Sequence, residues 1–438
     1  MLLIYIDRQT NRLGYTINLI FKELLDIEYM VTTSKDQFIA LDCAKLSYCK
    51  EKIYDELHIT SDKLLFETNI YSVNPTYTKE DGIDKIFRTY GEGDDFHFDL
   101  FSAVFYLVSR YEEHLPFIRD EHSRFCTSDS ILQQKNCLDK PVVNIWVNLL
   151  KEKLLEKYPS LEFPAKHFHF INTIDVDMAY SYKGKGVYRT IGGMCRDIIN
   201  GQFSAVKERF RVLLSLEKDP YDCFDYILRQ VDKYHLNTIF FFLMSMHNKF
   251  DKNISPYNHS FQMLIKRLSD YCEIGIHPSY YSIEEPDGIE MGMKMLSNII
   301  HRNINCSRFH YLRFHLPSSF RDIYDIGVRD EYSVGYAEHI GFRAGICSPY
   351  NFYDLERDQE TKLRVHPFMF MDVALKNGLK LNTTEAWQKI KQLIDEVKKV
   401  NGELISIWHN ESLSDTGQWQ GWRNLYEKQL EYIKEIDN

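Results

Sequence analysis

The sequence predicts an α/β fold whose larger part consists of parallel strand–helix units. The chain has 438 residues, more than one hydrophobic core normally organises, so two domains are expected. Pro159 and Pro164 end a helical pattern and mark a boundary there. Beyond it, short β-rich runs alternate with helical patterns. This alternation is typical of parallel strands that either close as a barrel or stay open as a doubly wound sheet.

Residues 1–160 are expected to form a mixed α/β accessory domain. They open with a strand at residues 2–6, and apolar residues then recur at intervals of three and four through residues 14–26. Residues 98–113 and 140–158 carry two further helix patterns. We find no glycine-rich phosphate loop and no cluster of ionisable residues in this part. We therefore expect it to shape one side of a cleft or to bind a partner.

Residues 165–438 are expected to form the domain of parallel strands and helices. Helical patterns at residues 221–235 and 384–402 lie between some of its strands. The strands are predicted at residues 168–176, 237–245, 272–277, 308–314, 341–347 and 404–409.

The composition excludes several classes of protein. The formal net charge is −10 and no dense Lys/Arg run occurs, so nucleic acid is not expected as a partner. No apolar segment approaches the roughly 20 residues that cross a bilayer, so no membrane span is expected. The nine cysteines are scattered and read as reduced thiols, and the first residues do not resemble a signal peptide. We therefore expect a cytoplasmic protein.

The stretch INTIDVDMAY, residues 171–180, places two carboxylates at the end of an apolar strand. Because side chains alternate faces along a strand, Asp175 and Asp177 point to the same side. Two close, buried anions are unfavourable unless a cation or a shared proton relieves them. A divalent metal ion is one explanation, and a salt bridge to the Lys and Arg residues of the following loop is the other.

Other predicted strands also end in ionisable side chains. His277 ends an apolar strand before Pro278, and His409 ends another. In the run SRFHYLRFH, Arg308 and His310 would share one face of a strand. Ligands bind at this edge of parallel α/β sheets, so the pattern favours a common site, although a single histidine at a strand end often has a structural role.

The order and content of these segments resemble the polysaccharide deacetylase family, carbohydrate esterase family 4, whose fold is a distorted (β/α) barrel of the NodB type. The resemblance covers residues 165–415. TIDVD is similar to the first family motif, usually T-F-D-D, and GIHPSYY lies where the family has H-[ST]-x-x-H. RFHY is similar to R-x-P-Y, and IWHN lies where the last motif carries its histidine. The signatures H-P-S, R-x-H-Y-L-R and G-F-R-A-G, with residues 98–113, further resemble a bacterial subgroup with a long N-terminal region.

The resemblance implies a metal-dependent hydrolase that removes an N-acetyl group from a carbohydrate. A zinc-type divalent ion lowers the pKa of its bound water to about 7 and polarises the acyl oxygen. By the family pattern, Asp175 is the general base, and Asp177 and His277 bind the metal. His409 protonates the departing amine.

One position departs from the family pattern. The second motif supplies another histidine four residues after the first, and here that position is Tyr281. Tyrosine is a poor ligand for a divalent ion unless it is deprotonated. His310 stands where the pattern usually has proline, and we expect it to complete the ligand set with Asp177 and His277. The alternative is that His310 only hydrogen-bonds a carboxylate and that the metal is weak or absent.

Four further residues are candidates for the site. Arg308 matches the arginine that orients the base carboxylate, and the backbone N–H of Tyr311 matches the oxyanion donor of the family. Arg343 lies near glycines that allow close backbone approach, which suits contact with a substrate, and a structural ion pair is the alternative. Asp330 could support His409 or bind a sugar hydroxyl, although loop aspartates mostly cap turns.

The leading hypothesis is therefore a zinc-type de-N-acetylase or related amide hydrolase acting on a carbohydrate. The first residues favour an intracellular substrate, such as a nucleotide-linked or lipid-linked sugar. One alternative is a non-catalytic glycan-binding or scaffold protein that kept a degenerate barrel, which Tyr281 favours. A second alternative is a phosphoesterase that uses the Asp pair and a metal.

Overall fold

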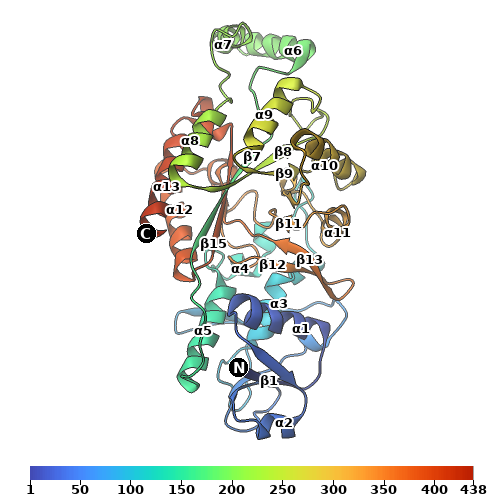
Figure 1. The fold of residues 1–438 in the computed structure, drawn as a ribbon, viewed down its shortest axis with the longest axis vertical. Coiled ribbons are helices and arrows are strands. Elements are labelled where there is room, and N and C mark those ends of the chain that lie inside the picture. Colours follow the sequence, from blue (N-terminus) through green and yellow to red (C-terminus); the bar gives the residue numbers. More distant parts are fainter. Residues whose placement is uncertain (438) are drawn as a thin grey trace.

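The computed structural model describes residues 1–437 and shows a mixed α/β architecture (Figure 1). A small parallel sheet lies near the N-terminus, and a nine-stranded sheet occupies the middle of the elongated molecule. At the end opposite the N-terminal sheet, helices α6 (Gly186–Ile199) and α7 (Phe203–Leu213) project from the body as a hairpin.

The N-terminal sheet has four parallel strands in the order β2-β1-β3-β4. Strand β1 is wholly buried, because one of its faces packs into the main core and the other packs against Phe38. The strands of this segment are β1 (Leu2–Ile6), β2 (Tyr29–Thr32), β3 (Ala44–Cys49), β4 (Leu57–Thr60) and the antiparallel pair β5 (Tyr77–Glu80) and β6 (Ile83–Ile86). Its helices are α1 (Asn11–Ile17), η1 (Asn18–Leu24), α2 (Lys35–Ala40), α3 (Leu100–Val108), α4 (Ile131–Gln134) and α5 (Val142–Lys157).

The large sheet has the strand order β12-β13-β11-β10-β9-β8-β7-β15-β14. All neighbours are parallel except β12 and β13. Its strands are β7 (His169–Val176), β8 (Asn237–Leu243), β9 (Glu273–His277), β10 (Cys306–Ser307), β11 (Asp330–Glu331), β12 (Tyr350–Asp354), β13 (Gln359–Val365), β14 (Phe370–Met371) and β15 (Glu403–His409). The other helices of this part are α8 (Phe224–Tyr234), α9 (His259–Ser269), α10 (Asp287–Ile300), α11 (Ser318–Asp325), α12 (Thr383–Lys399) and α13 (Trp422–Asp437).

The sheet is open, which is one of the two arrangements that the alternation of strands and helices allowed, and residues 1–437 do not form the closed version of the distorted barrel that the resemblance implied. Within residues 1–437, β12 and β14 form its two edges and do not pair with each other. Two features account for this arrangement. Strands β10, β11 and β14 are only two residues long, and the edge strand β12 runs antiparallel to its neighbour. Closure requires the two edge strands to pair, and two-residue strands give little ladder to extend around a barrel.

Two predicted strands are loops in the structure. Instead of a strand over residues 308–314, pairing ends at Ser307, and η5 (His310–Leu312) follows as a single 3₁₀ turn. The β9 strand leaves the sheet at Pro278, so the His310 N–H bonds the Pro278 carbonyl instead of a strand partner. Residues 341–347 form turns in which Gly341 and Gly345 have positive φ, and their backbone bonds the 138–143 segment.

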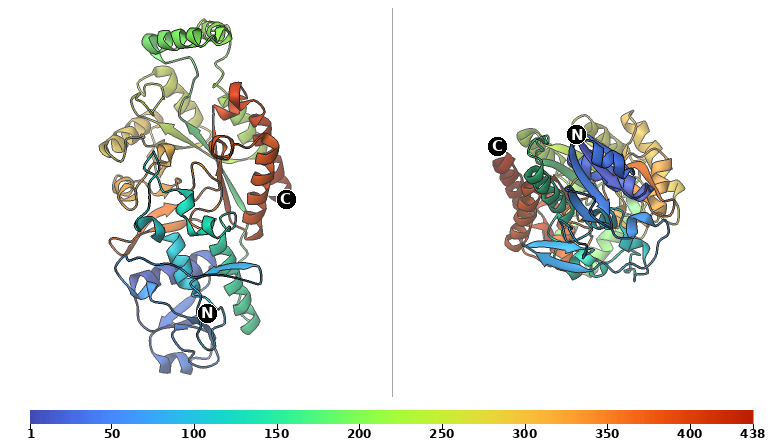
Figure 2. Two further views of the ribbon diagram at one scale, coloured as in Figure 1. Left: turned by 180° about the vertical axis from the view of Figure 1, so that it is seen from behind. Right: turned by 90° about the horizontal axis from the view of Figure 1, so that it is seen from below.

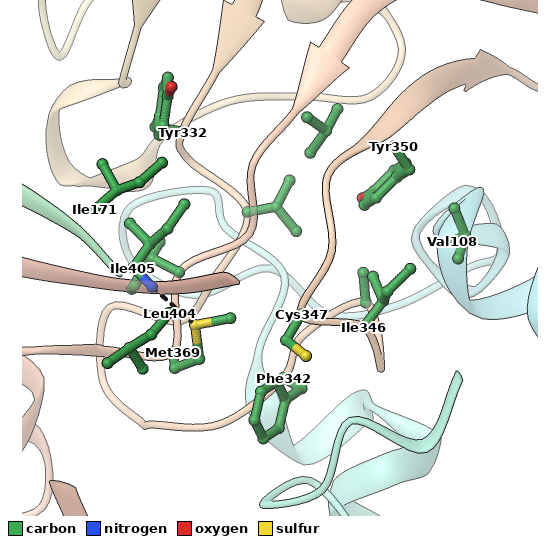
Figure 3. Close-up of a cluster of buried hydrophobic side chains, with 14 of the residues drawn as sticks. Val108, Ile171, Tyr332, Phe342, Ile346, Cys347, Tyr350, Met369, Leu404 and Ile405 are labelled. Atoms are coloured by element: carbon green, nitrogen blue, oxygen red, sulfur yellow. Dashed lines mark hydrogen bonds between the residues drawn. The ribbon is translucent and has the colours of Figure 1, made fainter. Parts of the chain in front are cut away.

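Most of the buried apolar residues form one large cluster that extends from the N-terminal segment into the large sheet. Figure 3 shows part of it, where Val108 of α3 faces Ile346 and Tyr350, while Ile405 of β15 packs beside Met369. The Ile405 N–H donates to the Met369 sulfur at 3.3 Å. The two parts of the chain therefore share a continuous core.

Figure 2 shows that the α6–α7 hairpin stands clear of the remaining helices in the reversed view as well. Elsewhere, helices cover the large sheet, with α12 and α13 packed against each other beside β15. Over residues 1–437, no helix has both the length and the apolar character needed to span a bilayer.

Candidate active site

The register of the large sheet gathers ionisable side chains at the carboxyl ends of its parallel strands. Asp175 of β7 lies beside His409 of β15, and Leu243 of β8 lies beside His277 of β9. Asp177 follows β7 by one residue. The sequence places these groups at one edge because each follows a buried apolar run, and parallel strands end together.

Asp177, His277 and His310 form a cluster of potential metal ligands. His277 Nε2 lies 3.3 Å from Asp177 Oδ1, and His310 Nε2 lies 3.3 Å from Asp177 Oδ2. One ligand atom from each of the three residues lies within 4.8 Å of the others. His310 therefore reaches the cluster, although it does so from the η5 turn instead of from the predicted strand.

The second nitrogen of each clustered histidine is held by an oxygen acceptor. His277 Nδ1 bonds the Arg308 carbonyl, and His310 Nδ1 lies 2.8 Å from Asp251 Oδ1. Asp251 also accepts from the Ser279 hydroxyl at 2.6 Å and from the Tyr280 N–H at 3.0 Å. Such acceptors place the proton on Nδ1 and leave Nε2 as the ligand atom, as is common for metal-binding histidines.

The charges in the cluster are strongly coupled. Burial acts to lower the pKa of His310, but the carboxylates of Asp177 and Asp251 outweigh it and raise this pKa to about 9. Burial acts in the opposite sense on Asp177, yet His310 and His277 hold its pKa well below the usual value. Negative charge is therefore retained on Asp177 at neutral pH.

The donor set fits a divalent metal ion. One carboxylate and two imidazoles are typical ligands of zinc sites that keep an open coordination position. Among the described residues, Asp177 Oδ1 is buried and has no hydrogen-bond partner. A buried carboxylate oxygen without a donor is unfavourable unless a cation lies near it.

Asp175 is held by Arg308. The Arg308 NH1 group donates to Asp175 Oδ1 at 2.8 Å and to the Thr173 hydroxyl at 2.8 Å, and its Nε donates to the Tyr332 carbonyl at 3.0 Å. Both charged side chains are almost fully buried, and the guanidinium lies over the Phe241 ring at 4.5 Å. The ion pair fixes the orientation of the Asp175 carboxylate and compensates its burial.

His409 is held on the other side of the cluster by Asp372. His409 Nδ1 lies 2.8 Å from Asp372 Oδ1, and the His409 N–H donates to Asp372 Oδ2 at 2.7 Å. His409 Nε2 points to the cluster and lies 3.8 Å from Asp177 Oδ2. Burial opposes protonation, but Asp372 and Asp177 outweigh it and raise the pKa of His409 well above its usual value.

Sequence reasoning missed two carboxylates of this site, Asp251 and Asp372. Asp372 follows the apolar run FMFM, so the strand-end pattern that identified Asp175 applies to it too. Asp251 lies in the loop after β8, and nothing in its local sequence separates it from an ordinary loop aspartate.

Tyr311 has an unusual backbone conformation beside the cluster. Its φ is 59° and ψ is 9°, in the left-handed region. Among residues 1–437 its backbone N–H has no hydrogen-bond acceptor, while its carbonyl accepts from Arg124 at 3.0 Å. Its ring packs against His122 and Phe250. Residues of the N-terminal segment thus reach the rim of the site.

Two other candidate residues, and the tyrosine that departs from the family pattern, lie outside the cluster of potential metal ligands. Arg343 makes an ion pair of the kind given as the alternative, since its guanidinium forms two bonds to Glu113 at 2.7 and 2.9 Å, and the residue is only 4% exposed. Asp330 pairs with His366 at 2.9 Å and does not support His409, whose partner is Asp372. Tyr281 packs beside Phe250 and is not among the clustered donors.

Two cavities adjoin the cluster. The first, of about 630 Å³, is called here the basic cavity, and its wall includes Met178, which directly follows Asp177, and Tyr221. The second, of about 440 Å³, includes His277 and Tyr281 in its wall together with several methionines. The second cavity therefore reaches the cluster at His277.

Comparisons with known proteins give the following matches. Residues 2–159 match a family described as a family of unknown function (DUF7033). No curated protein matches the chain. The structure is similar to a protein of Mycobacterium smegmatis that is provisionally assigned as a polysaccharide deacetylase, with 12% identity, 63% of this chain and 87% of that chain covered, and a TM-score of 0.40.

Two further solved structures are similar. One is a CE4 family pseudoenzyme from Bacillus anthracis, at 11% identity, with 62% of this chain and 66% of that chain covered and a TM-score of 0.31. The other is a polysaccharide deacetylase from Bacillus cereus, at 11% identity, with 62% of this chain and 88% of that chain covered and a TM-score of 0.31.

Proposed function

We propose that this protein is a metal-dependent hydrolase that removes an N-acetyl group from a carbohydrate, and that its open sheet is a variant of the NodB-type barrel. One observation carries the proposal. The donors of Asp177, His277 and His310 converge between a buried, arginine-held carboxylate, Asp175, and a carboxylate-held imidazole, His409. This is a set of groups that can hydrolyse an amide.

The residues present would hold a divalent ion through Asp177, His277 and His310, and we propose zinc because of their mixed oxygen and nitrogen donors. When bound, such an ion acts as a Lewis acid that polarises the amide carbonyl and lowers the pKa of water. The proposed ligand set explains why Tyr281 can replace a histidine. His310 supplies the second imidazole from a different segment.

The proposed steps assign one proton transfer to each flanking group. Asp175 accepts a proton from the attacking water, and Arg308 holds its carboxylate in orientation. The free N–H of Tyr311 donates to the carbonyl oxygen as negative charge develops on it. His409, protonated and fixed by Asp372, gives its proton to the nitrogen of the departing amine.

The test is the release of acetate from N-acetylated sugars by the purified, metal-loaded protein. Asp175→Asn should abolish release while the metal content remains unchanged, since Asp175 is not among the proposed ligands. Acetate release that survives in this variant would refute the assigned base.

The same assay separates the alternatives. Phosphate release from phosphorylated sugars, without acetate release, would indicate a phosphoesterase. Binding of a glycan with neither product would indicate a non-catalytic glycan-binding protein.

A further inference from the structure

The basic cavity collects cationic side chains in a chain that is acidic overall. Its wall contains five cationic side chains and one carboxylate, that of Asp197, while the whole chain has a formal charge of −10. The cations come from α6, from α7 and from the loops that support the hairpin, namely Lys185, Arg189, Arg196, Arg209 and Lys252. The cavity therefore concentrates positive charge beside the proposed active site.

The single carboxylate is already neutralised. Arg209 donates to Asp197 at 2.5 Å, and Arg196 lies 3.8 Å from the same carboxyl group. In the described part of the chain, Lys185 and Arg189 form no ion pair, and the Arg209 Nε is buried without a hydrogen-bond partner. Burial, together with Arg189 and Arg209, lowers the pKa of Lys185 to about 8. Five cationic side chains thus surround the cavity, with one carboxylate in the same wall.

The cavity is connected to the proposed site. Met178, in its wall, directly follows the proposed metal ligand Asp177. Asn410, which follows His409, donates to the carbonyls of Met178 at 3.0 Å and Tyr221 at 3.1 Å. A ligand that spans both places would have its reacting group at the metal cluster and its anionic group among the cations.

We propose that the basic cavity binds the diphosphate group of the substrate, so that the carbohydrate acted on is a diphosphate-linked sugar. This proposal rests on the proposed function for the identity of the sugar, but the anion site stands on its own residues. Guanidinium groups bind phosphate oxygens in paired hydrogen bonds, and several cations together suit a group with more than one negative charge.

The test uses inorganic pyrophosphate as the probe and isothermal titration calorimetry on the full-length, metal-loaded protein. We expect saturable binding, and we expect the double variant Lys185→Gln/Arg196→Gln to raise the Kd about tenfold or more. Neither side chain makes a hydrogen bond within the described residues, so the variant should fold. The matched control, Lys294→Gln/Lys391→Gln, removes two exposed lysines on other helices and should leave the Kd unchanged.

The variant Asp177→Asn removes a proposed metal ligand. It therefore distinguishes binding of pyrophosphate in the basic cavity from chelation of pyrophosphate by the metal ion. Binding that persists in Asp177→Asn and is lost in Lys185→Gln/Arg196→Gln supports the cavity. Absence of saturable binding, an unchanged Kd in the cavity variant, or loss in Asp177→Asn alone would overturn the proposal. Because acetate is not measured, failure of the proposed deacetylation would not be confused with failure of the anion site.

The source of the diphosphate is identified by competition. Displacement of pyrophosphate by a nucleoside diphosphate would indicate a nucleotide-linked sugar. Stronger displacement by an isoprenyl diphosphate in detergent would indicate a lipid-linked sugar. Either result supports the anion site, and displacement by neither would contradict a diphosphate ligand.

A second, independent observation concerns the opposite side of the same hairpin. By helical periodicity, Val187, Ile191 and Ile198 lie on the face of α6 opposite Arg189 and Arg196, which line the cavity. The exposed large apolar residues of the hairpin do not line the cavity, and they are Val187, Tyr188, Ile191, Ile198, Ile199, Phe203, Phe210, Leu213, Leu214 and Leu216. They form what is called here the outer face.

The outer face combines exposed apolar area with positive charge. Tyr188 is 94% exposed, Ile199 is 83% exposed and Phe203 is 69% exposed. Residues 183–218 contain eight Lys and Arg but three Asp and Glu. Lys207 and Arg211 lie beside Phe203 and Phe210 on α7. Projecting amphipathic helices with aromatic residues and flanking cations are typical of segments that lie in a membrane interface.

We infer that the outer face docks on the surface of an anionic lipid bilayer. The test is co-sedimentation of the full-length protein with vesicles of phosphatidylcholine, with and without phosphatidylglycerol. We expect binding that increases with phosphatidylglycerol and weakens with salt. Ile191→Ser/Phe203→Ser should abolish binding, and Lys207→Gln/Arg211→Gln should weaken it. Tyr90→Ser/Ile118→Ser, which changes exposed apolar residues outside the hairpin, is the matched control and should bind normally.

Two outcomes would overturn this inference. One is the absence of vesicle binding. The other is a dimer in solution that Ile191→Ser/Phe203→Ser converts to a monomer, since the outer face would then be a contact between two copies of the chain.

Discussion

At the scale of single residues, the site depends on carboxylates that hold imidazoles. Asp251 fixes His310 and Asp372 fixes His409, each through Nδ1 at 2.8 Å. In both pairs the Nε2 atom is directed toward Asp177. One imidazole is proposed as a metal ligand and the other as a proton donor. At His310 the carboxylate places the proton on Nδ1 and leaves Nε2 free to bind, while at His409 it favours the doubly protonated ring.

Asp372→Asn should lower kcat/KM by roughly a hundredfold or more, because the amide neither favours protonated His409 nor fixes its ring. Asp372 acts through His409 and is a positioning residue. The pH dependence of kcat is therefore the informative measurement. Its upper limb should move to lower pH, since loss of the carboxylate lowers the pKa of His409, while metal content stays the same.

The matched control for this change is Asp330→Asn, which alters another carboxylate–histidine pair, with His366, outside the cluster. It should leave the pH profile unchanged. An unshifted profile in Asp372→Asn, with only reduced protein stability, would show that Asp372 has a structural role alone.

The sequence predicted those site residues that follow long, buried strands. Asp175, His277 and His409 are placed by the register of parallel strands, which a pattern of apolar residues can indicate. The position of His310 depends on a turn with positive φ, which the alternation of side chains along a strand does not describe. His310 therefore reaches the cluster from a turn, whereas the prediction placed it on a strand.

At the scale of elements, strand β9 contains a glycine that leaves room for an aromatic ring of the neighbouring strand β8. Gly275 lies opposite Phe241 of β8, and a Cβ at this position would come within 2.5 Å of the Phe241 ring. The same ring supports the Arg308 guanidinium, which orients Asp175. Packing in the middle of the sheet is thus linked to the position of the proposed base.

Gly275→Ala should destabilise the protein by about 1–3 kcal/mol, because the ring must move in a closely packed core. It should also reduce kcat more than it changes KM, since Arg308 loses its support. Thermal unfolding and steady-state kinetics measure the two effects. Gly288→Ala, where no atom lies within 4 Å of the added Cβ, is the control and should not lower stability. Equal effects of the two changes would contradict the proposed packing constraint.

At the scale of the whole molecule, the N-terminal segment and the large sheet are joined by buried charges as well as by the apolar core. Glu113 lies between Arg110 and Arg343, with which it forms ion pairs at 2.8 and 2.7 Å. Burial acts to raise the pKa of Glu113, but Arg343 and Arg110 outweigh it and lower this pKa to about 2. Arg343 therefore joins the two parts of the chain.

This pair predicts a pH dependence of stability. The pKa of Glu113 is lower in the folded chain than its ordinary value of 4.5. Its contribution, about 3 kcal/mol, is therefore complete above that value and is lost as the pH falls toward 2. Glu113→Gln should be less stable than the wild type at pH 7, and the difference should shrink between pH 4.5 and pH 3. Denaturant unfolding at several pH values measures this, and a constant difference would contradict it.

The overall architecture was less predictable than the strand ends. The alternation of strands and helices indicated a parallel sheet, but closure depends on strand lengths and on the direction of an edge strand. The segment 341–347 is apolar and was predicted as a strand, yet it bonds the 138–143 segment of the N-terminal part. Such a contact between distant parts of the chain leaves no local pattern.

The central claim is that Asp177, His277 and His310 bind one divalent ion although Tyr281 replaces a histidine, and metal analysis of purified protein tests it most directly. We predict about one ion per chain in the wild type and in Tyr281→Phe, and loss of the ion in His277→Ala and in His310→Ala. Retention of the full metal content in His310→Ala, or its loss in Tyr281→Phe, would contradict the proposed ligand set.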